Sequence, residues 1–245
     1  MMNLTDQNLR EKEFHNKLQS KSKGRFENIF YKAISNAWDD FYNFLNTYAK
    51  NSEILDYGCG VGPVIEKVIK LNPKKITGID ISNVSIVKAR EKFTSSKVEL
   101  IVDNCENTSF SNDKFDIVYG LGILHHLKIS ECINEILRIL KPNGTLLFIE
   151  PLGTNPLINF YRFLTPGSRS KDEHPLMFKD FEIIKSNFKS VNIKYYGFLT
   201  LVFFPFYNSN KSKIFKALVK LDQLLFKIKI FKYFAWSVLI TAKKN

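Results

Sequence analysis

The sequence predicts an α/β protein built on a doubly wound, mainly parallel β-sheet. Two observations carry this prediction: from residue 52 onward short apolar runs alternate with segments of helical periodicity, and the first run ends in a glycine-rich turn. Alternating strands and helices are typical of parallel sheets with helices on both faces. We expect strands near 52–58, 75–80, 98–103, 115–121 and 144–150, separated by helices near 62–71, 82–92 and 130–140.

Length and composition favour a cytoplasmic globular protein with one large core. The chain has 245 residues, of which 44% are hydrophobic. Residues 1–24 are polar and are expected to be mobile, and the absence of an apolar stretch among the first twenty predicts no secretory leader. The three cysteines have no disulfide-like or metal-like spacing, and neither CxxC nor HExxH occurs. We therefore expect a reducing compartment and no metal site.

The turn after the first predicted strand reads Gly58-Cys-Gly-Val-Gly62, with glycine at every second position. Such a turn leaves its backbone bare, so that a ligand can lie directly on it. The second strand ends at Asp80, eighteen residues past Gly62, where a carboxylate can accept hydrogen bonds from ribose hydroxyls. These features predict a nucleoside site. A dinucleotide fingerprint would need a small residue at position 63, which is proline.

Polar residues also end or follow the later strands. Asp103 ends the third strand, His125 follows the fourth, and Glu150 ends the fifth. Ligands of open α/β sheets bind at the carboxyl ends of the strands. We therefore expect these three side chains and Asp80 to converge on one crevice.

Together these motifs resemble, in their order, those of class I S-adenosylmethionine (SAM)-dependent methyltransferases. The resemblance covers roughly residues 50 to 151 and is looser beyond, where the chain looks like small-molecule methyltransferases of the UbiE/methyltransferase-11 type. Besides the glycine turn and Asp103, the motifs are Phe115-Asp-Ile-Val-Tyr-Gly120, Leu124-His-His-Leu127, the Pro142-Asn-Gly144 turn, Glu150-Pro-Leu-Gly-Thr-Asn-Pro156 and Asp172-Glu-His-Pro175.

The resemblance implies a Rossmann-like, mainly parallel seven-stranded sheet with an antiparallel edge strand, N-terminal helices and a helical cap or insert. Segments with helical spacing between Arg25 and Ala49 would be the N-terminal helices, and Phe178–Phe188 a later helix. The last two strands would be Ser190–Thr200 and Ala235–Ala242. In these terms we expect an N-terminal helical extension over residues 1–50, a SAM-binding core over 51–151, and a lid, edge strands and helical insert of the same domain over 152–245.

SAM would be the cofactor and S-adenosylhomocysteine the product. Asp103 would recognise the adenine, although a capping aspartate explains it too, and Asp56 would orient the loop or the methionine amine. Packing explains Cys59 better than chemistry does, because a small residue is needed inside the glycine turn. The residues expected to bind the cofactor are Asp56, Gly58, Cys59, Gly60, Gly62, Asp80, Ile81, Asp103, Asn104 and Gly120.

Three histidines are candidates for a catalytic base, which is needed only if the nucleophile must lose a proton. His125 and His126 are adjacent, so we expect one to face the crevice while the other supports the turn, with His125 favoured as the base. His174, next to Glu173, lies in a proline-rich segment expected to be a lid. An exposed ion pair would explain those two residues equally well. Tyr161 and Arg162 are candidates for the acceptor pocket.

The C-terminal part of the chain is strongly basic. The net charge is +12, and residues 211–245 hold nine lysines and one acid, Asp222. Four lysines fall within about 80° of one another on a helical wheel, with apolar residues around the rest. Two interpretations stay open: the apolar surface packs against the core or another subunit, or the 211–234 helix touches an anionic membrane. The four lysines are Lys213, Lys216, Lys220 and Lys227.

The function expected from the resemblance is methyl transfer from SAM to a small or lipid-like acceptor, with oxygen as the expected acceptor atom. RNA methylation is a second possibility, but no Asn/Asp-Pro-Pro-Tyr/Phe motif follows the fourth strand, and nucleic acid is not expected as a partner. Two further functions stay open: a SAM-binding partner subunit, and a SAM enzyme that does not methylate. The sequence does not predict the identity of the acceptor or the oligomeric state.

Overall fold

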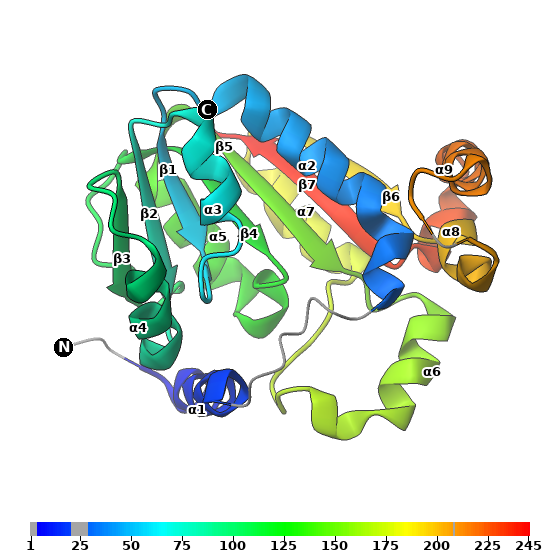
Figure 1. The fold of residues 1–245 in the computed structure, drawn as a ribbon, viewed down its shortest axis with the longest axis horizontal. Coiled ribbons are helices and arrows are strands. Elements are labelled where there is room, and N and C mark those ends of the chain that lie inside the picture. Colours follow the sequence, from blue (N-terminus) through cyan, green and yellow to red (C-terminus); the bar gives the residue numbers. More distant parts are fainter. Residues whose placement is uncertain (1–3, 21–28, 208) are drawn as a thin grey trace.

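A seven-stranded sheet forms the centre of the protein in a computed structural model that describes residues 4–20, 29–207 and 209–245. Its strand order is β3-β2-β1-β4-β5-β7-β6, and only β7 runs antiparallel to its neighbours. The predicted fold class is confirmed (Figure 1). The strands are β1 (Glu53–Tyr57), β2 (Lys75–Asp80), β3 (Val98–Val102), β4 (Phe115–Leu121), β5 (Leu140–Pro151), β6 (Ser190–Tyr196) and β7 (Ser237–Lys243).

Fifteen helical segments surround the sheet in the described part of the chain. The α-helices are α1 (Asp6–Ser20), α2 (Ser35–Tyr48), α3 (Ile65–Val68), α4 (Asn83–Lys92), α5 (Ile129–Ile139), α6 (Pro156–Leu164), α7 (Phe178–Asn187), α8 (Leu199–Val202) and α9 (Lys213–Leu225). The short 3₁₀ segments are η2 (Ile29–Ile34), η3 (Ile69–Leu71), η4 (Leu124–His126), η5 (Pro166–Ser168), η6 (Phe204–Phe206) and η7 (Lys229–Phe234).

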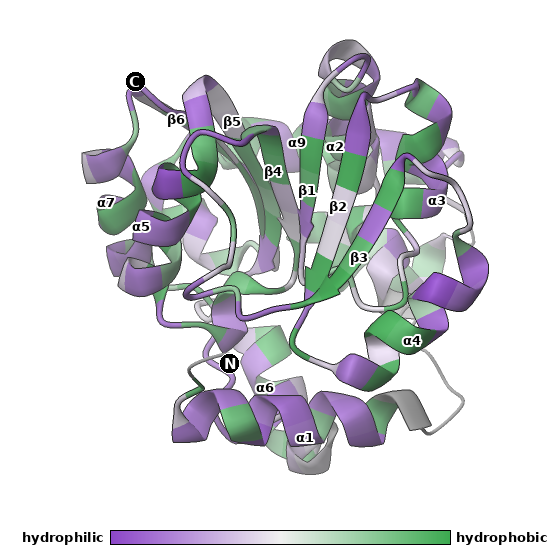
Figure 2. Ribbon diagram, turned by 90° about the vertical axis from the view of Figure 1, so that its left-hand side faces the viewer, coloured by the Kyte–Doolittle hydropathy of each residue, from purple (hydrophilic) through white to green (hydrophobic). Residues whose placement is uncertain are grey.

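The strands bury side chains on both faces of the sheet, as expected for a doubly wound protein. In β1, Leu55 and Tyr57 pack with residues of α5 and α7, whereas Ile54 packs with residues of α2, α3 and α4. The apolar residues of α5 recur at helical spacing and are buried, which explains why this segment is a helix on that face. Figure 2 shows the apolar strands enclosed between the helical layers.

The strand order reverses between β1 and β4, which lie side by side although β2 and β3 separate them in the sequence. In such sheets the crevice for a ligand lies at this reversal, beyond the carboxyl ends of the strands. The glycine turn after β1 and the segment after β4 therefore meet at the predicted position of the site.

The N-terminal segment departs from the prediction. Residues 6–20, expected to be mobile, form helix α1, which crosses beneath the carboxyl ends of the strands (Figures 1 and 2). Residues 21–28, which include part of the predicted amphipathic segment, lie outside the described residues. The prediction of a mobile N-terminal segment was wrong because polar contacts hold α1 in place. A helix held in this way shows no apolar periodicity in its sequence.

Several predicted boundaries also shift. The helix expected over 62–71 is split into α3 and η3, and the lid segment contains helix α6. Strand β6 ends at Tyr196, because α8 begins within the predicted strand. Strand β5 begins at Leu140 and absorbs the predicted turn as an irregularity, in which Asn143 has a φ of 63°. Ser82 caps α4, and its side chain accepts a hydrogen bond from the Ser85 amide.

No helix in the described ranges is long and apolar enough to cross a membrane.

Candidate active site

The glycine turn has the conformation that the sequence predicts. Gly58, Gly60 and Gly62 have φ values of 76°, 54° and 77°, a region that L side chains rarely adopt. A Cβ atom at Gly58 would lie 2.7 Å from the Ile123 side chain, and one at Gly62 would lie 2.4 Å from Phe93. At Gly60, by contrast, nothing lies within 4 Å of that position. The backbone at Gly60 therefore faces open space in which a ligand can lie.

Asp80 joins the end of β2 to this turn. Its Oδ2 accepts a hydrogen bond from the Gly60 amide at 2.9 Å, and its Oδ1 accepts one from the Ser82 amide at 2.8 Å. Burial raises the pKa of the carboxyl group, although these bonds oppose the shift. Each carboxylate oxygen can accept a further bond. Asp80 thus fixes the turn and keeps acceptor capacity for ligand hydroxyls.

Asp56 lies in β1, just before the glycine turn. It is only 4% exposed, and the Tyr119 hydroxyl donates a hydrogen bond to its Oδ2 at 2.9 Å. Burial raises its pKa to about 8; the bond from Tyr119 opposes the shift, and the nearby negative charge of Asp80 adds to it. A cationic group bound near Asp56 would favour the ionised form.

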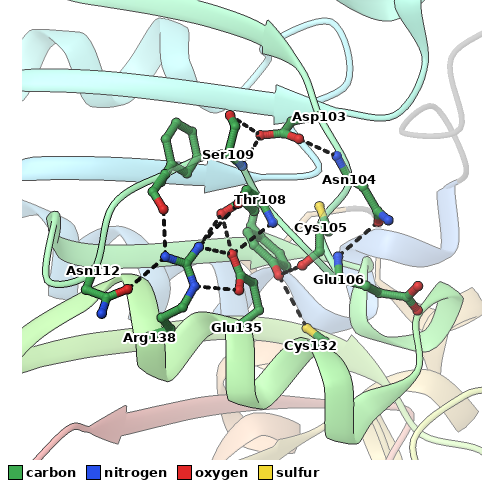
Figure 3. A network of polar contacts seen from close by, with 12 residues as sticks. Asp103, Asn104, Cys105, Glu106, Thr108, Ser109, Asn112, Cys132, Glu135 and Arg138 are labelled. Atoms are coloured by element: carbon green, nitrogen blue, oxygen red, sulfur yellow. Dashed lines mark hydrogen bonds and ion pairs between the residues drawn. The ribbon is translucent and has the colours of Figure 1, made fainter. Parts of the chain in front are cut away.

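Asp103 has both carboxylate oxygens engaged within its own loop (Figure 3). Oδ1 accepts from the Asn104 amide at 2.9 Å, and Oδ2 accepts from the Ser109 amide and hydroxyl at 2.9 and 2.8 Å. The Asn104 side chain in turn accepts from the Glu106 amide. These contacts fit the capping role, and recognition of adenine by Asp103 and Asn104 stays a prediction.

The loop after β3 is tied to α5 by a buried carboxylate. Glu135 accepts hydrogen bonds from the Thr108 amide and hydroxyl, and Arg138 contacts Glu135 at 2.6 Å. The Arg138 guanidinium also donates to the Phe110 carbonyl and to Asn112 (Figure 3). This network sets the position of Asp103 relative to the sheet.

Three other residues were predicted to bind the cofactor: Cys59, Gly120 and Ile81. The positions of the first two are explained by close packing. The buried Cys59 sulfur lies 3.0 Å from where a Cβ of Gly78 would be, and burial raises its pKa well above the usual value. A Cβ at Gly120 would lie 2.4 Å from the Phe148 ring. Ile81 is half-buried next to Asp80. Their role in cofactor binding stays a prediction.

His125 is oriented by a fully buried carboxylate at the end of β5. Its Nδ1 lies 2.8 Å from Oε2 of Glu150, whose Oε1 accepts from the Ile123 and Leu124 amides at 2.8 Å. A carboxylate oxygen accepts hydrogen bonds, so this contact orients the ring with the proton of its neutral form on Nδ1. The remaining ring nitrogen, Nε2, is then the one that can accept a proton.

His126 faces helix α1. Its Nδ1 lies 3.1 Å from Oε2 of Glu11, and Nε2 of His15 lies 3.4 Å from the same oxygen. Burial and the neighbouring His125 ring lower the pKa of His126 to about 4. Burial alone would raise the pKa of Glu11, but His126, His15 and the Ser170 hydroxyl hold it well below its usual range.

The structure brings the predicted histidines close together. The ring centroids of His125 and His126 are 4.2 Å apart, and the His174 amide donates a hydrogen bond to the His125 carbonyl at 2.8 Å. The His174 side chain itself is exposed, and Glu173 pairs with Arg162 at 2.8 Å. Both rings are enclosed, because η4 is buried between α1 and β5, and which of the two histidines faces the crevice stays a prediction.

Sequence reasoning missed the polar residues of α1. Asn8 and Glu11 are 2% and 4% exposed, and Asn8 donates to Glu106 at 2.9 Å. Farther along the helix, Asn16 accepts a hydrogen bond from the Ser82 hydroxyl at 2.6 Å. The available signal was the helical spacing of Asn8, Glu11 and His15, which puts them on one face. Through these contacts α1 spans the site from Ser82 to His126.

Two groups of side chains in the described part of the chain could hold a metal ion. Glu11, His15 and His126 form one, and His125, His126 and Glu173 form the other; in each, the ligand atoms lie within 4.8 Å of one another. Nitrogen and carboxylate donors of this kind suit transition metals. The absence of a metal stays a prediction.

Comparisons with known proteins agree with this geometry. Residues 54–144 match the model of a family described as "Methyltransferase domain". A ubiquinone/menaquinone biosynthesis C-methyltransferase, UbiE, from Geotalea daltonii is 32% identical over 124 residues, covering 48% of this chain and 53% of the relative. A sterol 4-C-methyltransferase from Caenorhabditis elegans is 28% identical over 112 residues, covering 44% of this chain and 33% of the relative. The chain thus spans about half or less of the length of these relatives.

Solved structures are similar over most of the chain. A SAM-dependent methyltransferase from Mesorhizobium loti has a TM-score of 0.60 at 15% identity and covers 84% of this chain and 97% of its own. A second similar structure is geranyl diphosphate C-methyltransferase from Streptomyces coelicolor, solved in complex with Mg²⁺, geranyl diphosphate and S-adenosylhomocysteine. Its TM-score is 0.62 at 15% identity, and the match covers 86% of this chain and 77% of the methyltransferase. The predicted resemblance to class I SAM-dependent methyltransferases is therefore confirmed, with residues 54–144 matching a methyltransferase domain.

Proposed function

We propose that this chain transfers a methyl group from SAM to a small, lipid-like acceptor. One observation carries the proposal: the bare backbone of Gly60 faces open space and is held by Asp80, at the reversal of the strand order. This is a cradle for a nucleoside, and it lies in the segment that matches a methyltransferase domain.

The residues present fit SAM. The Gly60 backbone would lie against it, Asp80 would accept hydrogen bonds from the ribose hydroxyls, and Asp56 would face the methionine ammonium. Asp103 and Asn104 would adjoin the adenine. When bound, SAM supplies a methyl group already activated by its sulfonium, so the chain mainly has to align the acceptor in a dry site. Such positioning can contribute on the order of 7 to 11 kcal/mol.

His125 would accept the proton that leaves the acceptor. Its Nδ1–H donates to Glu150, which orients the ring and stabilises the imidazolium that forms, while Nε2 is the accepting atom. His126 and Glu11 close the same region from the side of α1 and exclude water. His174 lies next to them through its backbone contact with His125. We therefore keep His125 as the proposed base, with His126 and His174 as neighbours in the acceptor site.

The names of similar proteins support a lipid-like acceptor, since they include quinone, sterol and geranyl diphosphate methyltransferases. These names specify carbon as the methylated atom, which favours carbon over the oxygen that the sequence analysis expected. A carbon acceptor also loses a proton when methylation is complete, so the need for a base remains.

A transfer assay tests the proposed function. The purified chain is incubated with methyl-labelled SAM and total cell extract, which is then partitioned between organic and aqueous phases. Label in the organic phase is the expected result, and it should fall at least tenfold in the His125→Asn variant. Nuclease-sensitive label in the aqueous phase would support an RNA methyltransferase instead. No transfer by protein that binds SAM would favour a partner subunit or a SAM enzyme that does not methylate.

A further inference from the structure

Most of the exposed large apolar side chains lie in two segments of the chain. Fourteen of the eighteen exposed large hydrophobic residues among those described lie in residues 157–164 and 202–233. Soluble proteins rarely gather exposed apolar residues to this extent without a partner. The fourteen are Leu157, Phe160, Tyr161, Phe163, Leu164, Val202, Phe203, Phe206, Ile214, Leu221, Leu224, Ile228, Ile230 and Tyr233.

Helix α6 contributes the most exposed of these side chains. Phe163 is 80% exposed and Phe160 is 63% exposed, and none of the nine residues of the helix is buried. A helix this short is marginal in water unless an apolar face is covered. The core does not cover α6, so the helix needs an external apolar surface.

Helix α9 has a second uncovered stripe. Phe215 and Asp222 face inward, whereas Ile214, Leu221 and Leu224 are about half exposed on the outer side. This spacing forms one stripe along a helix. The core of the chain therefore leaves this stripe partly uncovered.

The charge around the two helices is of one sign. Residues 199–234 contain seven lysines, and their one acid, Asp222, is buried and accepts hydrogen bonds from the Leu199 amide and from Thr200. None of the six exposed lysines is in an ion pair with any described residue. The exposed face therefore combines apolar side chains with positive charge and presents no acid. The seven are Lys211, Lys213, Lys216, Lys220, Lys227, Lys229 and Lys232.

The two regions adjoin. The Asn155 side chain, which caps α6, donates a hydrogen bond to the Phe234 carbonyl at the end of η7. In Figure 1, α6, α8 and α9 all lie at the right-hand end of the molecule, away from β3 and α4. We call residues 157–164 and 202–233 together the docking surface.

We propose that the docking surface binds the interface of a membrane that contains anionic lipid. Aromatic and aliphatic side chains would enter the boundary between headgroups and acyl chains, and the lysines would contact the anionic headgroups. A second copy of the chain fits less well. In a twofold interface the same patch meets itself, so two lysine-rich faces without acids would oppose each other.

The docking surface is linked to the site. Arg162 of α6 pairs with Glu173 at 2.8 Å, and a carboxylate oxygen of Glu173 lies within 4.8 Å of ring nitrogens of His125 and His126. The proposal that a lipid-soluble acceptor enters along this side rests on the proposed function. The membrane contact itself does not.

Vesicle co-sedimentation of the full chain, without SAM or acceptor, tests the docking. We expect binding to phosphatidylcholine vesicles that contain phosphatidylglycerol, weak binding to phosphatidylcholine alone, and loss of binding at about 0.5 M salt. Replacing the three lysines of α9, Lys213, Lys216 and Lys220, by glutamine should weaken vesicle binding on the order of 100-fold. Each lysine near the surface contributes roughly a factor of five to the binding constant. The matched control replaces Lys70, Lys92 and Lys189 by glutamine. These lysines are exposed outside the docking surface, and the control variant has the same net charge as the test variant.

Apolar insertion is tested separately with Phe160→Ser and Phe163→Ser, with Val87→Ser on α4 as the control. All three side chains are more than half exposed, so the fold should be retained. We expect the two α6 variants to bind less tightly by about tenfold or more and the control to bind normally.

Equal loss in the test and control lysine variants, or unchanged binding in the α6 variants, would overturn the proposal. So would a stable dimer by light scattering that the α6 variants dissociate, because a second copy would then cover the surface. The assay contains no cofactor and measures no transfer. A failure here therefore leaves the proposed methyl transfer to be judged by its own assay.

Discussion

Asp56 shows how one buried carboxyl group couples the site to pH. Its ordinary pKa is 3.8, and in the folded chain it is raised to about 8, mainly by burial within the sheet. The folded state therefore holds a proton on Asp56 near neutral pH, whereas the unfolded chain has lost it.

We expect the free energy of unfolding to contain a component that is complete below about pH 4 and is lost as the pH rises toward 8. A folded pKa above the unfolded value gives this sign, because the folded state binds the proton more tightly. The variant Asp56→Asn should flatten the dependence of the urea midpoint on pH across this range. Asp113→Asn, at an exposed position, is the control. A dependence in Asp56→Asn as steep as in the unchanged chain would contradict the assignment.

The glycine turn and Asp80 could be predicted from sequence, since a positive φ and a strand end leave local signals. Glu11 could not, because its partner His126 is distant in the sequence and the contact forms only when α1 lies across the strand ends. Asp103 was identified as a strand end, but its hydrogen bonds depend on a loop conformation that spacing does not specify.

Among the elements, α5 does more than cover a face of the sheet, because its buried Glu135 holds the loop after β3. We expect Glu135→Ala to lower the free energy of unfolding by about 2 to 3 kcal/mol, since the Thr108 amide loses its acceptor and Arg138 its partner. Glu131→Ala on the same helix should cost less than about 0.5 kcal/mol, because the Lys128–Glu131 pair is exposed. Urea titration measures both values, and equal losses would show that Glu135 does not anchor the loop.

Helix α1 is attached mainly through polar contacts at the strand ends, such as those of Asn8 and Asn16. Elements with few apolar contacts open most easily. We expect amide hydrogens of α1 to exchange faster than those of β1 and β4, and to slow when S-adenosylhomocysteine binds beneath the helix. Helix α7, on the far side of β5, should not respond. Identical exchange of α1 with and without the ligand would show that the helix does not cover the bound cofactor.

At the scale of the whole molecule, the sheet was predictable because its strands are continuous apolar runs that must be buried. Helices α1 and α6 were not, because neither buries an apolar face in the core: α1 relies on polar contacts, and α6 exposes its phenylalanines. The start of β5 was misplaced because Pro142 and Gly144 signal a turn, which the strand accommodates as an irregularity. Elements stabilised by contacts outside the core leave the weakest sequence signal.

Calorimetric titration of the purified chain with SAM decides whether SAM binds between the glycine turn and Asp80. We expect one site per chain and at least tenfold weaker binding by Asp80→Asn, because a neutral amide is a poorer acceptor for the ribose hydroxyls, a loss of about 1.4 kcal/mol or more. Asp113→Asn should bind like the unchanged chain. No binding by the folded chain, or equal affinity in Asp80→Asn, would show that this turn and Asp80 do not form a SAM site.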